Sequence, residues 1–67
     1  MGTKETLDDI IENSGLKLES IATKMGISSN YLWRKRNKPE TMDVDFVVRL
    51  AEVLSVDVDR LIAAIRQ

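Results

Sequence analysis

The sequence predicts a small all-α protein, and three observations support this prediction. Apolar residues recur at the three- and four-residue spacing of helices in five separate segments. Residues that start or stop helices, among them Ser28, Gly26 and Pro39, stand between those segments. Alternating apolar and polar stretches bounded by turn residues, which would indicate strands, do not occur. With 67 residues the chain has room for one domain, which we expect to span residues 1–67.

The first two helices each carry one apolar face and end at a glycine. Thr3 or Thr6 can cap the first helix, and Gly15 is placed to end it. Gly26 ends the second helix in the same way, because glycine adopts the left-handed conformation of a helix C-terminus at little cost. The two apolar faces consist of Leu7, Ile10 and Ile11, and of Leu18, Ile21, Ala22 and Met25.

The remaining three helices are indicated by caps, a proline and two apolar segments. Ser28 caps a third helix that runs to about Arg36, and Pro39 prevents its continuation. A fourth helix starts near residues 41–43 and is apolar on nearly all sides, so we expect it to be the most buried element. A fifth helix begins after Asp57. The apolar positions of these last two helices are Val44, Phe46, Val47, Val48, Leu50, Ala51, Val53 and Leu54, and Val58, Leu61, Ile62 and Ile65.

Composition excludes several classes of function. The chain has no cysteine and no histidine, which rules out disulfides, zinc fingers and catalysis by a thiol or an imidazole. A chain this short can hardly enclose a substrate pocket, so we expect no enzyme, no cofactor and no metal site. No apolar run reaches the roughly 18 residues of a membrane span, and no signal-peptide pattern opens the chain. We therefore expect a cytoplasmic protein without a membrane partner.

Charge is distributed unevenly along the chain. The net charge is −1, but residues 16–38 carry six basic side chains and one acidic side chain, a net charge of +5. The other 44 residues carry four basic and ten acidic side chains, a net charge of −6. Such a chain can direct its basic part onto a polyanion, although a solvated run of charges is the plainer interpretation.

The connection between the second and third helices carries the clearest functional signal. Gly26 and Ile27 form a tight turn between two short helices, which is the arrangement of a helix-turn-helix over about residues 18–36. From Leu7 to Leu61 the chain resembles the phage-repressor (Cro/cI, XRE-like) helix-turn-helix family without a gap. The matching stretches are residues 15–28, the pair Tyr31 and Leu32 with Arg34, and residues 50–61.

The resemblance implies a five-helix repressor-like domain whose third helix, residues 28–36, enters the major groove of double-stranded DNA. With Leu32 turned inward, the helical period turns Asn30 and Arg34 outward, where their forked hydrogen-bonding groups suit adenine and guanine. The predicted base contacts are Ser29, Asn30, Trp33 and Arg34. The predicted phosphate contacts are Lys17, Tyr31, Lys35, Arg36, Asn37 and Lys38.

Four of the notable residues have more than one interpretation. Trp33 is either exposed, contacting a base or a phosphate, or lies across a neighbouring helix, and we favour partial burial. The hydroxyl of Tyr31 reaches a phosphate or caps a neighbour. Lys35 reaches a phosphate or lays its stem over the core. Leu18 is either part of the core or, as we expect, a small exposed apolar spot.

The chain also departs from the family pattern. The first helix is acidic where the family is often basic, Leu18 replaces a phosphate-contacting glutamine, and the glycine expected near Lys38 is absent. Lys35 stands where the family has an apolar residue, and Arg36 where it has an acidic one. The loop proline is Pro39 instead of lying at Met42. The acidic residues of the first helix are Asp8, Asp9 and Glu12.

We therefore predict a sequence-specific DNA-binding transcriptional regulator that resembles a small Cro-like phage repressor. Specific binding usually needs two half-sites, so we expect a weak homodimer through the fourth and fifth helices, where Ile62 and Ile65 lie near the surface. The alternative is a protein-binding modulator or antirepressor that docks on a partner regulator with the same fold. The acidic first helix, Leu18 and Trp33 motivate this alternative.

Overall fold

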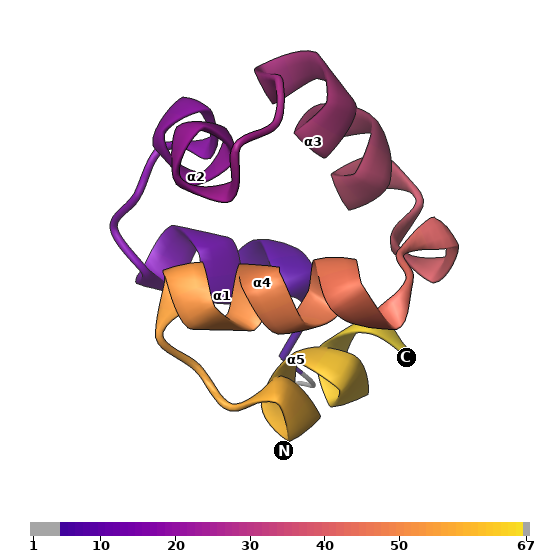
Figure 1. The fold of residues 1–67 in the computed structure, drawn as a ribbon. Coiled ribbons are helices and arrows are strands. Elements are labelled where there is room, and N and C mark those ends of the chain that lie inside the picture. The colour runs from indigo at the N-terminus through magenta and orange to yellow at the C-terminus, as the bar shows by residue number, and fades with distance from the viewer. Residues whose placement is uncertain (1–4, 67) are drawn as a thin grey trace.

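The computed structural model describes residues 5–66, which form five α-helices and one short 3-10 helix (Figure 1). No residue in this range belongs to a strand, so the prediction of an all-α protein is confirmed. The predicted order and approximate bounds of the helices are confirmed as well. The elements are α1 (Leu7–Asn13), α2 (Leu18–Met25), α3 (Ser29–Asn37), η1 (Pro39–Thr41), α4 (Val44–Leu54) and α5 (Val58–Ile65).

Side-chain caps fix the starts of three helices. The Asp9 backbone N–H donates to Thr6 Oγ1 at 3.1 Å, and the Thr6 N–H donates to Asp9 Oδ2 at 3.0 Å, which closes a capping box on α1. Thr3, the other predicted cap, lies outside the described residues. Ser28 accepts from the Tyr31 N–H at 3.1 Å and so caps α3, as predicted. Asp43 accepts from the Phe46 N–H at 2.8 Å and caps α4.

The helix ends follow from backbone conformation. Gly26 ends α2 with φ 74°, the left-handed conformation that favours glycine. Ser55 ends α4 in the same region with φ 58°, without the help of a glycine. Besides preventing the continuation of α3, Pro39 begins the 3-10 turn η1, which connects α3 to α4.

The core lies between α4 and the helices that surround it. Helix α4 packs against α2 on one side and α5 on the other, and α1 also contacts α5 (Figure 1). Of the fourteen buried apolar residues in the described chain, α4 supplies five, so the prediction that it is the most buried element is confirmed. Leu50 is fully buried, whereas Val44 at the start of α4 is 76% exposed. The five residues that α4 buries are Phe46, Val47, Leu50, Ala51 and Leu54.

Candidate functional site

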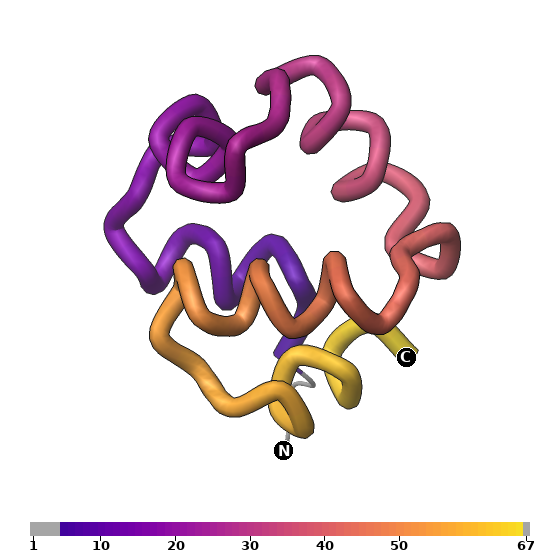
Figure 2. The backbone as a smooth tube through the Cα atoms, viewed as in Figure 1, coloured from indigo at the N-terminus to yellow at the C-terminus, as the bar shows by residue number. Residues whose placement is uncertain are grey.

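Helices α2 and α3 are joined by a sharp turn (Figure 2). The Ile27 N–H donates to the Ala22 carbonyl at 3.0 Å, and the Gly26 N–H donates to the Thr23 carbonyl at 3.1 Å. These two bonds satisfy carbonyl groups at the end of α2. The Ile27 side chain is half-buried and packs against the core, so it holds the angle between the two helices.

Contacts on one flank of α3 attach it to α4 and to η1. Leu32 is only 1% exposed and anchors α3 in the core. Tyr31 packs edge-to-face against Phe46 of α4, with 6.0 Å between ring centroids and 64° between ring planes. Lys35 Nζ donates to the carbonyl oxygen of Thr41 at 2.9 Å and lies 5.6 Å from the centroid of the Tyr31 ring. The Lys35 ammonium group therefore has partners within the protein, and both interpretations of this residue, a phosphate contact or a stem laid over the core, stay predictions.

The opposite flank of α3 is attached to α1 by an ion pair. Arg36 Nε lies 2.9 Å from Asp8 Oδ1 in this ion pair, and the two side chains are 32% and 57% exposed. Asp8 is an acidic residue on a helix where the resembled family is often basic, and Arg36 is a basic residue where that family is acidic. The two departures thus face each other and neutralise each other's charge.

Between these flanks, α3 presents a face that has no partner within residues 5–66. Asn30, Trp33 and Arg34 are exposed, and their side chains form no hydrogen bond or ion pair in the described part of the chain. Trp33 is 52% exposed, so it does not lie in the core. We call this surface the free face of α3. It consists of Ser29, Asn30, Trp33, Arg34 and Asn37, all of them exposed.

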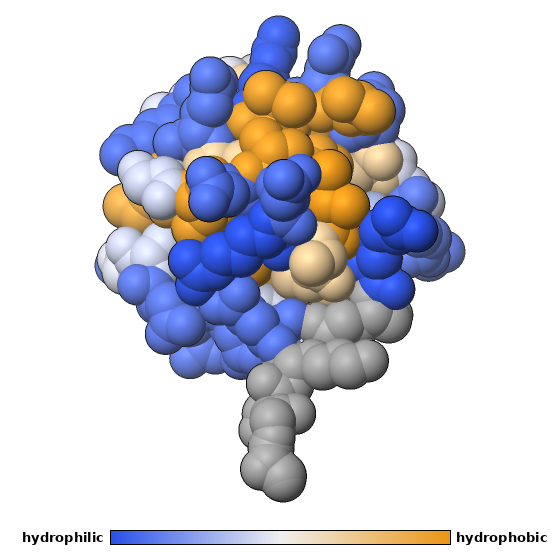
Figure 3. All heavy atoms as spheres, turned by 90° about the horizontal axis from the view of Figure 1, so that it is seen from below, coloured by the Kyte–Doolittle hydropathy of each residue, from blue (hydrophilic) through white to orange (hydrophobic). Residues whose placement is uncertain are grey.

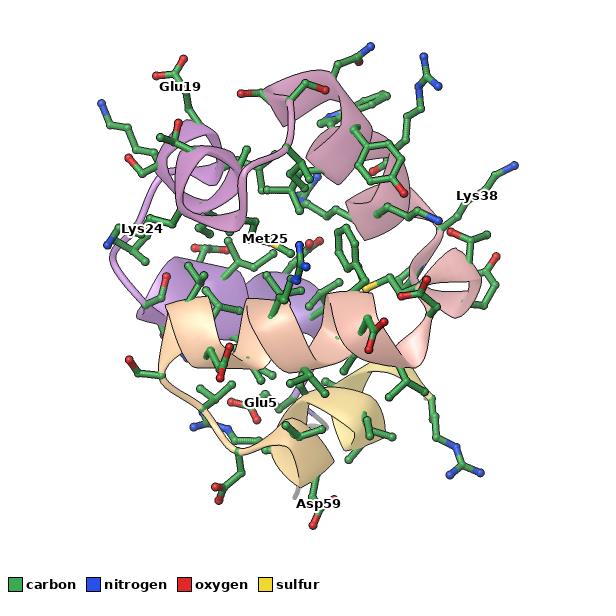
Figure 4. All side chains as sticks on the ribbon, in the orientation of Figure 1. Glu5, Glu19, Lys24, Met25, Lys38 and Asp59 are labelled. Carbon is green, nitrogen blue, oxygen red and sulfur yellow. The ribbon has the colours of Figure 1, made fainter. Side chains whose placement is uncertain are left out.

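Two further lysines lie near the ends of the α2–α3 unit. Lys38 follows the last residue of α3, and its side chain extends away from the protein (Figure 4). Lys17 precedes the first residue of α2 and is also exposed. Neither lysine side chain forms a hydrogen bond or an ion pair in the part of the chain that the structure describes. Both ammonium groups are therefore free to meet an anion.

Leu18 differs from its expected position. It is half-buried and packs against the core instead of forming an exposed apolar spot. The reason is helical geometry, because Leu18 shares the face of α2 that carries Ile21, Ala22 and Met25, all buried. Met25 points into the interior in Figure 4, whereas Glu19 and Lys24 on the same helix point outward.

The ten predicted contact residues thus fall into two groups. Tyr31, Lys35 and Arg36 interact with neighbouring elements, and the others have free side chains within residues 5–66. Asp8 and Thr41, the partners of Arg36 and Lys35, were not predicted from the sequence. The sequence held a signal for Asp8, because the first helix and position 36 both depart from the charge typical of the resembled family, in opposite directions. Nothing in the sequence points to the Thr41 carbonyl.

Comparison with known proteins identifies no relative. The chain matches no family model, no curated protein and no solved structure. Among residues 5–66, no three acidic, histidine or cysteine side chains gather as metal ligands, and no helix is long and apolar enough to cross a membrane. The functional interpretation therefore depends on the geometry and chemistry of α3 and its surroundings.

Proposed function

We propose that this chain is a sequence-specific DNA-binding transcriptional regulator, a helix-turn-helix protein of the phage-repressor type that inserts α3 into the major groove. The observation that supports this proposal most directly is the free face of α3. The helix is attached to α4, η1 and α1 along its flanks, while its outward side chains have no partner in residues 5–66. A rigid helix with unpaired polar side chains is what base reading in the major groove requires.

The chemistry of the free face suits DNA bases. Asn30 and Arg34 are one helical turn apart, which separates them by about 6 Å along the helix axis. The amide of asparagine can pair with adenine through two hydrogen bonds, and the guanidinium of arginine can pair with guanine in the same way. We assign these two residues to base contacts in the proposed complex, together with Ser29 and Trp33.

Phosphate contacts in the proposed complex come first from Lys17 and Lys38. Their ammonium groups are free and lie at the two ends of the α2–α3 unit. Asn37 is exposed and can also reach a phosphate. Lys35 and Arg36 are weaker candidates, because each would have to give up a partner within the protein.

A duplex-binding titration tests the proposal. Duplexes selected by the full chain from a random-sequence library are titrated at several salt concentrations. We expect selected duplexes to share a sequence motif and their affinity to fall as salt rises, because phosphate contacts release counterions. Duplex binding that is absent, or that does not respond to salt, contradicts the proposal.

A weak homodimer completes the proposed regulator, because one small helical domain reads few base pairs. A hollow of about 230 Å³ lies between the start of α4 and α5. Figure 3, which views the molecule from the α5 side, shows an apolar area on this face bordered by hydrophilic residues. The lining of the hollow is apolar except for one carboxylate and consists of Met42, Asp43, Val44, Val47, Val58, Ile62 and Ile65.

A second copy of this chain is the occupant that we propose for this hollow. Met42 directly follows η1, so the hollow begins one short turn after α3 ends. A symmetric pair formed there carries both copies of α3 in one assembly, as two half-sites require. The small apolar area fits a micromolar association. Sedimentation should show a dimer at high concentration that Ile65→Asp abolishes, and a strict monomer unaffected by Ile65→Asp contradicts the dimer.

The alternative function, docking on a partner regulator, has less support in the structure. It was motivated by an acidic first helix, Leu18 and Trp33. Leu18 packs against the core, and Asp8 pairs with Arg36, so these features have roles within the fold. A pull-down with a purified helix-turn-helix regulator, run beside the duplex titration, distinguishes the two functions.

A further inference from the structure

We infer that Trp33 is a specificity-determining residue that contacts the C5-methyl group of a thymine in the DNA site. This inference rests on the proposed function. Trp33 lies on the free face of α3 with 52% of its surface exposed, the most exposed of the aromatic side chains in residues 5–66. An exposed indole that forms no hydrogen bond or ring contact with residues 5–66 offers a rigid apolar surface to whatever α3 meets.

The surroundings of Trp33 point to a small apolar ligand group. On α3, Trp33 lies three residues after Asn30 and four before Asn37, and both neighbours are exposed and polar. Leu18, the other apolar residue considered for a docking surface, packs against the core. Tyr31, the other exposed aromatic residue of α3, lies outside the free face, on the flank that packs against Phe46 of α4.

A protein partner would need more apolar area than this single side chain supplies. Interfaces between proteins have a buried core formed by several apolar side chains. In the major groove, by contrast, the thymine methyl is a single apolar group among the polar edges of the bases. One indole between two asparagines is complementary to that pattern.

The position of Trp33 also indicates which thymine it contacts. Residues three apart on a helix have Cβ atoms about 5–6 Å apart, so Trp33 and Asn30 reach neighbouring parts of the groove. We assign Asn30 to an adenine. The thymine contacted by Trp33 therefore belongs to that A·T pair or to the pair next to it.

Replacing thymine with uracil tests this contact, because the exchange removes only the methyl group. Each thymine of a duplex selected from the random library is replaced in turn, and each duplex is titrated with the wild-type chain and with Trp33→Ala. For the wild type we expect about a fourfold loss of affinity at one position, the value that burial of one methyl-sized group predicts. For Trp33→Ala the same exchange should leave affinity unchanged, because the contact is already absent.

Two matched variants control for indirect effects. Trp33→Phe keeps an aromatic surface and should retain most of the preference for thymine. Lys38→Ala should weaken the thymine and uracil duplexes equally, because it removes a phosphate contact and not a base contact. Thermal melting should be the same for Trp33→Ala and the wild type, because the indole lies outside the core.

The outcomes separate this inference from the proposed function. The chain could bind duplexes in a salt-dependent way while every thymine-to-uracil exchange affects the wild type and Trp33→Ala equally. That result overturns the inference and leaves the DNA-binding function intact. Absence of duplex binding overturns both. Replacing each cytosine with 5-methylcytosine provides the same methyl group from the other natural source. If methylation of a cytosine raises affinity for the wild type but not for Trp33→Ala, and no uracil exchange has an effect, the assignment to thymine is overturned. The methyl contact then belongs to 5-methylcytosine.

Discussion

Helices α3 and α4 use their side chains in opposite ways. Helix α4 buries five of its eleven residues, whereas α3 buries one of nine, Leu32. The exposed side chains of α3 either attach its flanks to other elements or remain free. Stability and recognition are thus assigned to different helices. Substitutions in the buried face of α4 should change folding, and substitutions on the free face of α3 should change binding alone.

The largest effect is expected in α4. Leu50→Ala removes a fully buried side chain at the centre of the core and should lower the free energy of unfolding by about 2–5 kcal/mol. This is a large part of the roughly 5–15 kcal/mol that stabilises a typical domain. Thermal melting followed by circular dichroism measures the change. The exposed neighbour provides the control, since Arg49→Ala should alter stability by no more than about 0.5 kcal/mol. A Leu50→Ala variant that melts like the wild type would show that α4 is not the centre of the core.

The free face of α3 should give the second-largest effect, on binding instead of stability. Asn30→Ala removes the proposed adenine contact and should weaken binding to the selected duplex by about 1–3 kcal/mol. It should also relax the preference at one base position. Melting of the variant should stay within about 0.5 kcal/mol of the wild type, because Asn30 is exposed and its side chain has no partner in residues 5–66. A clear loss of stability would break the contrast between the two helices.

The contrast was predictable from the sequence to a large extent because its causes are local. The apolar periodicity around Leu50 identifies α4 as buried, and helical geometry alone turns Asn30 and Arg34 away from Leu32. Ser28 and Gly26 each form their capping hydrogen bonds with residues only a few positions away in the sequence, so both caps can be recognised without knowledge of the tertiary fold.

The flank contacts of α3 were not predicted, because they depend on how α3 packs against α1, η1 and α4. Arg36 and Asp8 are far apart in the sequence. The sequence predicts a phosphate contact for Arg36, and Asp8 belongs to the acidic first helix that motivates the protein-binding alternative. Lys35 donates to the Thr41 carbonyl, and any residue at position 41 has this group.

The end of α4 was not predictable from residue type, because Ser55 adopts a left-handed conformation that serine does not signal.

A third, smaller effect should separate a free basic residue just after α3, Lys38, from an attached one within it, Arg36. In a DNA titration, Lys38→Ala should reduce the slope of log affinity against log salt by about 0.9, because one phosphate contact is lost. Arg36→Ala should leave that slope unchanged and instead lower the free energy of unfolding by less than about 1 kcal/mol, through loss of the partly exposed pair with Asp8. If Arg36→Ala reduces the slope as much as Lys38→Ala does, Arg36 leaves Asp8 for a phosphate in the complex.

The smallest expected effect concerns an ion pair that lies in neither α3 nor α4. Arg60 of α5 donates through Nε to Glu5 Oε1 at 2.8 Å and through its second nitrogen to Oε2. This hydrogen bonding lowers the pKa of the Glu5 carboxyl below its ordinary value of 4.5. A carboxyl whose pKa is lower in the folded state stabilises the fold above its ordinary pKa, and that contribution disappears as pH falls through the lowered value. The wild-type chain should therefore lose some stability through this pair as the pH falls below the ordinary value of 4.5.

Glu5→Gln tests the contribution of the Glu5 carboxylate, which includes its pair with Arg60. The variant has no carboxylate at position 5, so its melting temperature should fall less steeply with acidification than that of the wild type. Glu52→Gln is the matched control: it removes an exposed glutamate that forms no ion pair with the described residues and should retain the wild-type dependence on pH. Parallel melting curves for the wild type and Glu5→Gln as the pH falls below 4.5 would show that the pair adds nothing. Because both partners lie at the surface, the difference should be far smaller than that for Leu50→Ala, where burial rather than charge supplies the free energy.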